Sequence, residues 1–253
     1  MSDALVAVIA FVCTFGGALL GILLHTRLPD HHRDADSKDV VKLVMGLIAT
    51  ISALVLGLLI SSARSAYDAQ DTEVQQLGMH LVQLDRVLTT LGPKGSEPRE
   101  LLRKLVAADL ARTWPADGAR GSDVPTAETK WHAEMLFDQV ANLTPTTGAE
   151  RFSQSRALQL LTTMGETRRL LLEQAHGSLS WPFFVVLVFW LSVLFIGFGL
   201  FARFNVTVVV ALFLGAISVA GAIFLILEMD RPYSGLMQVS SLPIRSALAV
   251  IGR

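Results

Sequence analysis

Four long apolar stretches limit what this chain can fold into more than any other feature. They lie at about 4–24, 43–63, 183–202 and 206–227, and none of them contains Asp, Glu, Lys or Arg. Each is long enough to cross about 30 Å of hydrocarbon, which takes roughly 20 apolar helical residues. Because lipid offers the backbone no hydrogen-bond partner, every crossing must be a helix. The sequence therefore predicts an all-α, polytopic membrane protein with four transmembrane helices.

The composition agrees with this class and excludes several others. Of the 253 residues, 52% are hydrophobic, and the mean hydropathy of +0.51 is too high for an ordinary soluble protein. A net charge of -1 gives no basic excess that would indicate a nucleic-acid partner. The single cysteine, Cys13, can form neither an intramolecular disulfide nor a multi-thiolate metal site.

The spans divide the chain into four predicted segments. With four crossings, both termini and the polar stretch between spans two and three share one side of the membrane. Basic residues flank the membrane almost equally on both sides, so the positive-inside rule does not choose the cytoplasmic face. The expected segments are spans one and two at 1–63, a polar helical insertion at 64–180, spans three and four at 181–228, and a C-terminal tail at 229–253.

The second span continues into the insertion as one long helix. No proline occurs from Val40 to about Leu91, and Gly92-Pro93 ends the pattern. At 1.5 Å per residue this helix would be roughly 75 Å long. Its polar part carries apolar residues spaced by three and four, as in a helical bundle: Val74, Leu77, Leu81, Leu84, Leu88 and Leu91. Further helices are expected at 97–113, 127–142 and 149–177, which together predict a helical-bundle insertion.

One face of the second span is small and weakly polar. Its residues recur at spacings of four, three, four and four, and this set is called the stripe below. Two interpretations stay open: close helix packing of the small-xxx-small kind, or the lining of a water-filled pore. Both can hold in an oligomer. The stripe consists of Gly46, Thr50, Ala53, Gly57 and Ser61.

Charged residues gather where spans two and four reach the same side of the membrane. Acidic groups at a helix C-terminus oppose the macrodipole, so those after span four need a compensating partner. Two interpretations stay open here as well: a charged ring that locks helices two and four together, or an ion-selecting vestibule. The ring comprises Arg64, Asp68, Glu228, Asp230 and Arg231.

Nothing in the sequence indicates an enzyme, a cofactor or a metal. No GxxxxGKS, HExxH, CxxC or GxSxG motif occurs. The one dense polar cluster away from the membrane ends is PDHHRDAD at 29–36, with His31 and His32. Adjacent histidines on a short loop rarely converge on one ion, so a solvated loop is the favoured interpretation.

Two segments resemble a known family. SARSAYDAQ at 62–70, continued by QLGMHLVQLDRVL, and MDRPYSGLMQVSS at 229–241 are similar to the bacterial membrane family catalogued as bestrophin-like, a domain of unknown function. Tyr233 takes the aromatic place of the Asp-Arg-Pro-aromatic-x-Gly signature. The resemblance implies four spans and a homopentameric anion channel of the bestrophin kind. It also implies a pore lined by span two, with the insertion and both termini in the cytoplasm.

Two functions follow as hypotheses. In the first, the chain forms a homo-oligomeric channel for inorganic anions in the inner membrane, and the insertion forms a vestibule. In the second, it is a non-conducting membrane scaffold or accessory subunit that binds a partner through its insertion. The tail is expected to form a short helix, resting either at the lipid headgroups or against the bundle.

Overall fold

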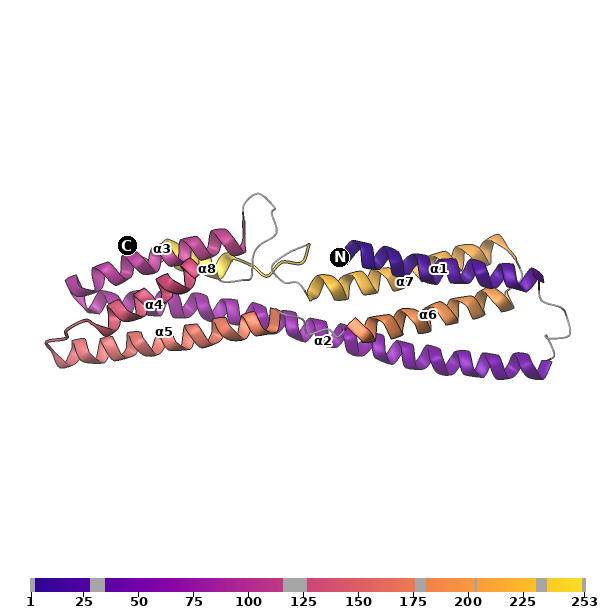
Figure 1. Cartoon of the computed structure of the whole chain (residues 1–253), viewed down its shortest axis with the longest axis horizontal. Coiled ribbons are helices and arrows are strands. Elements are labelled where there is room, and N and C mark those ends of the chain that lie inside the picture. Colours follow the sequence, from indigo (N-terminus) through magenta and orange to yellow (C-terminus); the bar gives the residue numbers. More distant parts are fainter. Residues whose placement is uncertain are drawn as a thin grey trace. The chain divides into compact units, whose positions relative to one another are not determined.

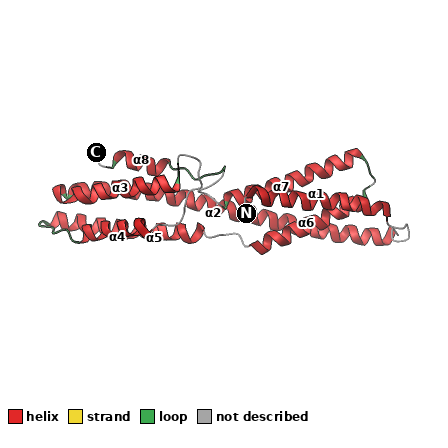
Figure 2. Ribbon diagram, turned by 45° about the horizontal axis from the view of Figure 1, so that its top comes forward, coloured by secondary structure: helices red, strands yellow, loops and turns green. Residues whose placement is uncertain are grey.

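The residues that the computed structural model describes are mostly helical, and no strand occurs among them (Figures 1 and 2). Four helices, α1, α2, α6 and α7, are long and apolar enough to cross a membrane. The predicted class, all-α with four transmembrane helices, is therefore confirmed. The described residues are 3–27, 35–115, 127–175, 181–202, 204–230 and 236–251.

The chain divides into two compact units, and α2 (Ala35–Thr90) contributes to both. The first unit contains residues 1–65 and 177–230. Its other helices are α1 (Asp3–Arg27), α6 (Trp181–Phe201) and α7 (Val206–Met229). Within this unit, α1 packs against both α6 and α7.

Glycine brings the backbones of α1 and α6 into direct contact. A Cβ added to Gly21 would overlap the carbonyl oxygen of Ile196, and one added to Gly199 would overlap the carbonyl oxygen of Ala18. One turn before Gly21, a Cβ on Gly17 would lie 3.1 Å from the Ile196 side chain. Helices in lipid gain stability mainly from close packing, which small residues permit. This crossing therefore fixes the two helices against each other.

Polar and aromatic contacts extend this packing along α1. Near its C-terminal end, the Nδ1 atom of His25 donates a hydrogen bond of 2.7 Å to the carbonyl oxygen of Leu200 on α6. Toward its N-terminal end, the rings of Phe11 and Phe15 both make edge contacts with Phe213 of α7, with centroids 5.7 and 5.4 Å apart. Edge-to-face geometry of this kind is favourable between aromatic rings.

The second unit contains residues 66–176 and 231–253. Besides residues 66–90 of α2 it includes the 3-10 helix η2 (Gly92–Gly95), α3 (Ser96–Thr113), α4 (Ala127–Ala141), α5 (Gly148–Ala175) and α8 (Leu242–Val250). The three insertion helices expected from the sequence agree with α3, α4 and α5 to within two residues at each end. The predicted helical bundle is thus confirmed.

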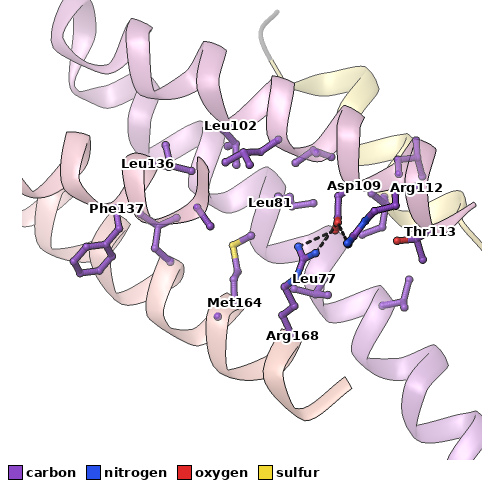
Figure 3. A pocket seen from close by; sticks show the side chains of 18 of the residues that line it. Leu77, Leu81, Leu102, Asp109, Arg112, Thr113, Leu136, Phe137, Met164 and Arg168 are labelled. Atoms are coloured by element: carbon purple, nitrogen blue, oxygen red, sulfur yellow. Dashed lines mark hydrogen bonds and ion pairs between the residues drawn. The ribbon is translucent and has the colours of Figure 1, made fainter. Parts of the chain in front are cut away.

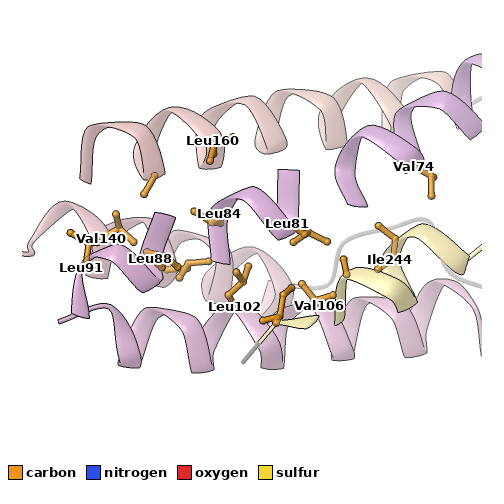
Figure 4. Packing of buried hydrophobic residues seen from close by; sticks show 14 of the residues in the cluster. Val74, Leu81, Leu84, Leu88, Leu91, Leu102, Val106, Val140, Leu160 and Ile244 are labelled. Carbon is orange, nitrogen blue, oxygen red and sulfur yellow. The ribbon is translucent and has the colours of Figure 1, made fainter. Parts of the chain in front are cut away.

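The core of the second unit is built around α2. The leucine seam predicted from spacing is buried there, and Leu84 and Leu88 are completely inaccessible (Figure 4). Leu102 and Val106 of α3 and Val140 of α4 pack into the same core. The helix stops where expected because Gly92 adopts a φ of 60°, a left-handed conformation that side chains disfavour.

The C-terminal segment packs against this bundle, which decides between the two placements expected for it. The Nε1 group of Trp114, just after α3, donates a hydrogen bond of 2.9 Å to the carbonyl oxygen of Val239. In addition, Gly78 of α2 leaves room for Pro243 of α8, because an added Cβ would lie only 3.0 Å from it. The tail therefore completes the helical bundle.

Ion pairs hold the ends of the insertion helices. Arg99 of α3 donates two hydrogen bonds to Asp85 of α2, at 2.8 and 3.1 Å, and this contact raises the pKa of Arg99. At the other junction, Glu150 accepts hydrogen bonds from the Lys94 ammonium at 2.9 Å and from the backbone N–H of Thr146 at 2.7 Å. Lys94, followed by that N–H, lowers the pKa of Glu150 from 4.5 to about 2.

Gly21→Ala should destabilise the first unit, because the new methyl group would overlap the Ile196 carbonyl oxygen. Overpacking of this kind costs about 1–3 kcal/mol, so we expect a lower midpoint of thermal unfolding in detergent. Gly16→Ala is the matched control, since a Cβ there meets no heavy atom of any described residue within 4 Å. Equal midpoints for the two variants would contradict the close α1–α6 crossing.

Glu150→Gln should make stability less sensitive to acid. Since the folded state lowers the pKa of Glu150 from 4.5 to about 2, the charged carboxylate contributes stability that is fully present above pH 4.5. That contribution is lost as the pH falls toward 2. We expect the unfolding midpoints of the parent and the variant to differ at pH 6 and to approach each other as the pH falls from 4.5 toward 2. Glu166→Gln, on an exposed position of the same helix, is the control; an unchanged gap at low pH would refute the assignment.

Candidate functional site

The membrane part of α2 uses one face to pack within the first unit. Its buried residues recur at spacings of seven and four: Met45, Ser52, Leu59 and Ala63. The Met45 side chain occupies the space beside Gly197 of α6, where a Cβ would lie 2.5 Å from its Sδ atom. This face is therefore committed to contacts inside the protomer.

The stripe lies on another face of α2. At 3.6 residues per turn its centre is about 135° away from the buried face. All five members, Gly46, Thr50, Ala53, Gly57 and Ser61, are exposed in the protomer. A Cβ added to Gly46 or Gly57 would meet no heavy atom within 4 Å among the described residues. The stripe is thus available to water or to another molecule.

A row of leucines borders the stripe. The centre of this row lies about 70° from the centre of the stripe, and the stripe lies between the row and the buried face. The four side chains are between 61% and 76% exposed, which is far more than a packed interior position allows: Leu43, Leu47, Leu54 and Leu58. So much apolar surface on a membrane helix requires lipid or a protein partner.

The polar capacity of the stripe is limited and specific. The Thr50 hydroxyl donates a hydrogen bond of 2.9 Å to the carbonyl oxygen of Gly46. In this rotamer the hydroxyl proton is used inside the helix, so the oxygen lone pairs are what Thr50 presents outward. No charged side chain lies between residues 43 and 63. The face can therefore hold water without binding an ion tightly.

The predicted charged ring is only partly described. Arg64 and Asp68 lie one turn apart on the exposed side of α2, while Glu228 is buried in the last turn of α7 and Asp230 caps that helix. Each of these four residues takes part in an interaction. Arg231 lies outside the described residues, so the ring stays a prediction. His31 and His32 of the PDHHRDAD segment also lie outside the described residues, so the interpretation of that segment stays a prediction.

Two features escaped the sequence argument. Gly17 and Gly21 form a small-xxx-small pair on α1, a signal that is visible in the sequence but is less extended than the stripe. The other is an ion cluster in the second unit, in which Asp109 binds both Arg112, three residues away, and Arg168 of α5. A partner 59 residues away leaves no local spacing signal.

Comparison with known proteins agrees with this architecture. Two solved structures, of single-substitution variants of a bacterial bestrophin homologue from Klebsiella pneumoniae, are 12% and 11% identical to this chain. They align over 97% and 98% of it and 99% of their own chains, with TM-scores of 0.65 and 0.68. At that identity the likeness shows a shared fold. No curated protein matches the sequence.

The family is shown by the sequence itself. The model of the Bestrophin-like domain matches residues 12–244, which run from within the first span through the fourth and include the whole insertion. This four-span membrane protein belongs to the Bestrophin-like family.

Proposed function

We propose that the chain assembles into a homo-oligomeric channel that conducts inorganic anions, with the stripe of α2 lining the pathway. The observation that carries the proposal is that all five stripe residues are exposed, while another face of the same helix already packs within the protomer. A small, weakly polar face that no helix of its own unit covers is what a pore lining requires. Membership in the Bestrophin-like family supports the choice of anions.

The three faces of α2 suit distinct roles in a ring of copies. The face with Met45 and Leu59 packs within its own protomer. The leucine row contacts the neighbouring copy, and the stripe between these two faces points to the central axis. Heterologous contacts of this kind close into rings. The proposal places the insertion and both termini on the cytoplasmic side of the inner membrane.

Conduction would depend on weak and repeated contacts. A pathway lined by Gly46, Ala53 and Gly57 keeps side-chain bulk low, so that an ion can retain part of its water. Thr50 can offer its proton to an anion only by releasing the Gly46 carbonyl oxygen. An ion that is bound this weakly can leave again, which conduction demands.

The leucine row also favours a second candidate, a non-conducting scaffold. Leu43 and Leu54, which are 76% and 65% exposed, would serve equally well to bind another membrane protein. In that case the stripe would be covered by a partner and shielded from water. Labelling and flux separate the two functions.

Cysteines introduced along the stripe should react with a membrane-impermeant thiol reagent. After Cys13→Ser, we expect Gly46→Cys, Thr50→Cys and Gly57→Cys in the assembled protein to be modified, because a pore brings water to them. Leu59→Cys, on the buried face, is the control that should stay protected. Protection of the whole stripe would favour the scaffold.

Proteoliposomes containing the purified protein should release chloride faster than potassium. Gly57→Leu should reduce chloride flux at least tenfold, because four added carbons narrow the pathway at a position where a Cβ clashes with none of the described residues. Gly221→Leu on α7 is the matched control, since a Cβ there also meets no heavy atom within 4 Å in the part of the chain that the structure describes. The absence of any anion or cation flux would refute the channel.

A further inference from the structure

The second unit contains a pocket of about 430 Å³ beside its hydrophobic core (Figure 3). Residues of α2, α3, α4, α5 and α8 line this pocket. Four of them also belong to the buried core: Leu81, Leu102, Val106 and Leu136. Pockets that bind small molecules commonly measure roughly 300–1,000 Å³ and have a mainly apolar lining. This pocket therefore has the size of a small-molecule site, and it lies outside the membrane-spanning segments.

The pocket interrupts the packing of the core. Further apolar side chains of its lining are only partly buried although they pack against the core: Leu77, Leu105, Leu161 and Met164. Native interiors are close-packed, with few voids larger than a water molecule, so a pocket of this size leaves part of the described core unpacked. An apolar molecule in the pocket would remove that surface from water, which is favourable.

The charged residues of the described lining balance each other. Two are acidic, Asp109 and Glu134, and two are basic, Arg112 and Arg168. Arg168 donates two hydrogen bonds to Asp109, at 2.8 and 2.6 Å, and Arg112 donates a third at 2.7 Å (Figure 3). Arg112 also takes part in a further interaction. A ligand of either sign would meet both charges there, so the lining favours neither anions nor cations.

This balance selects against ions. An ion that entered the pocket would give up part of its hydration, which costs free energy unless a partner of opposite charge replaces the water. Asp109 and Arg168 already satisfy each other, so a charged ligand could gain such a partner only by breaking their hydrogen bonds. An uncharged molecule leaves the pair intact and still gains the burial of its apolar surface.

We propose that this pocket binds an uncharged, apolar small molecule of about two fused rings in size, held among Leu81, Leu102, Leu136 and Met164. An apolar cavity of about 150 Å³ holds one benzene ring, and this pocket measures about 430 Å³. Because five helices supply the lining, the ligand would contact α2 and α8 together and stabilise the bundle. The site is separate from the stripe and does not depend on ion conduction.

A thiol placed in the lining detects the ligand at the site itself, whereas an apolar ligand also dissolves in lipid and detergent. In the full-length Cys13→Ser protein, Gly165→Cys introduces this thiol where a Cβ meets no heavy atom of a described residue within 4 Å. We expect naphthalenemethanol to slow its reaction with a water-soluble thiol reagent, and this protection should saturate. Gly148→Cys, on the same helix and not among the described lining residues, should react equally fast with and without the ligand.

The absence of charge is tested with two compounds that carry the same ring system. At neutral pH, naphthoate is an anion and naphthylmethylammonium is a cation. Half-maximal protection should require about tenfold more of either ion than of naphthalenemethanol, because each ion loses hydration without gaining a net attraction from the lining. Equal protection by either ion would overturn the assignment to an uncharged ligand. Non-saturable protection, or a thiol that is already unreactive without ligand, would overturn the site.

Filling the pocket provides an independent test. Gly165→Leu should prevent binding, because its side chain takes the place of the ligand at a position where a Cβ clashes with none of the described residues. At about tenfold the half-protecting concentration of naphthalenemethanol, the unfolding midpoints of the parent and of Gly148→Leu should rise by about 3–5 °C. The midpoint of Gly165→Leu should stay unchanged. An equal rise in Gly165→Leu, or no rise in the parent, would refute the site.

Discussion

The need to satisfy every backbone hydrogen bond in hydrocarbon governs this protein. It forces all four apolar stretches into helices. The hydrocarbon also removes the hydrophobic driving force that would otherwise pack these helices together, because lipid tails are as apolar as the side chains. Close approach has to replace that force. Gly21 and Gly199 supply it, because each lets the backbone of the other helix occupy the place of a side chain. The long helix α2 joins the same unit through Met45, which fills the space beside Gly197.

In the polar insertion, ordinary hydrophobic burial takes over. The same helix that shows leucines on an exposed face between residues 43 and 58 buries Leu84 and Leu88 completely in the second unit. Charged pairs such as Arg99 with Asp85 then tie the surrounding helices to it. The helix α2 is therefore adapted to lipid in its first part and to a water-exposed bundle in its second. Its exposed face in the membrane part is the surface on which the proposed channel depends.

Much of the fold was accessible from local patterns. Spans could be located because about 20 uncharged residues are needed to cross the membrane, and the insertion helices because their apolar residues recur at helical spacing. Gly92 and Pro93 marked the end of α2, because glycine and proline both disfavour the continuation of a helix. Whether the stripe packs inside the protomer or faces outward could not be predicted from the sequence, since Gly46, Thr50 and Gly57 suit both helix packing and contact with water. The Asp109–Arg168 pair was also hidden, because its partners are 59 residues apart.

The sequence by itself determined the membrane class, the number of spans, the helical insertion and the family, because these depend on hydrophobicity, periodicity and short motifs along the chain. Only the tertiary structure decided that Gly17 and Gly21, instead of the stripe, make the tight contact within the protomer. It also placed the tail against the bundle and brought Arg168 beside Asp109. These features arise from residues distant in sequence, whose mutual positions are set by how helices pack and not by any local pattern.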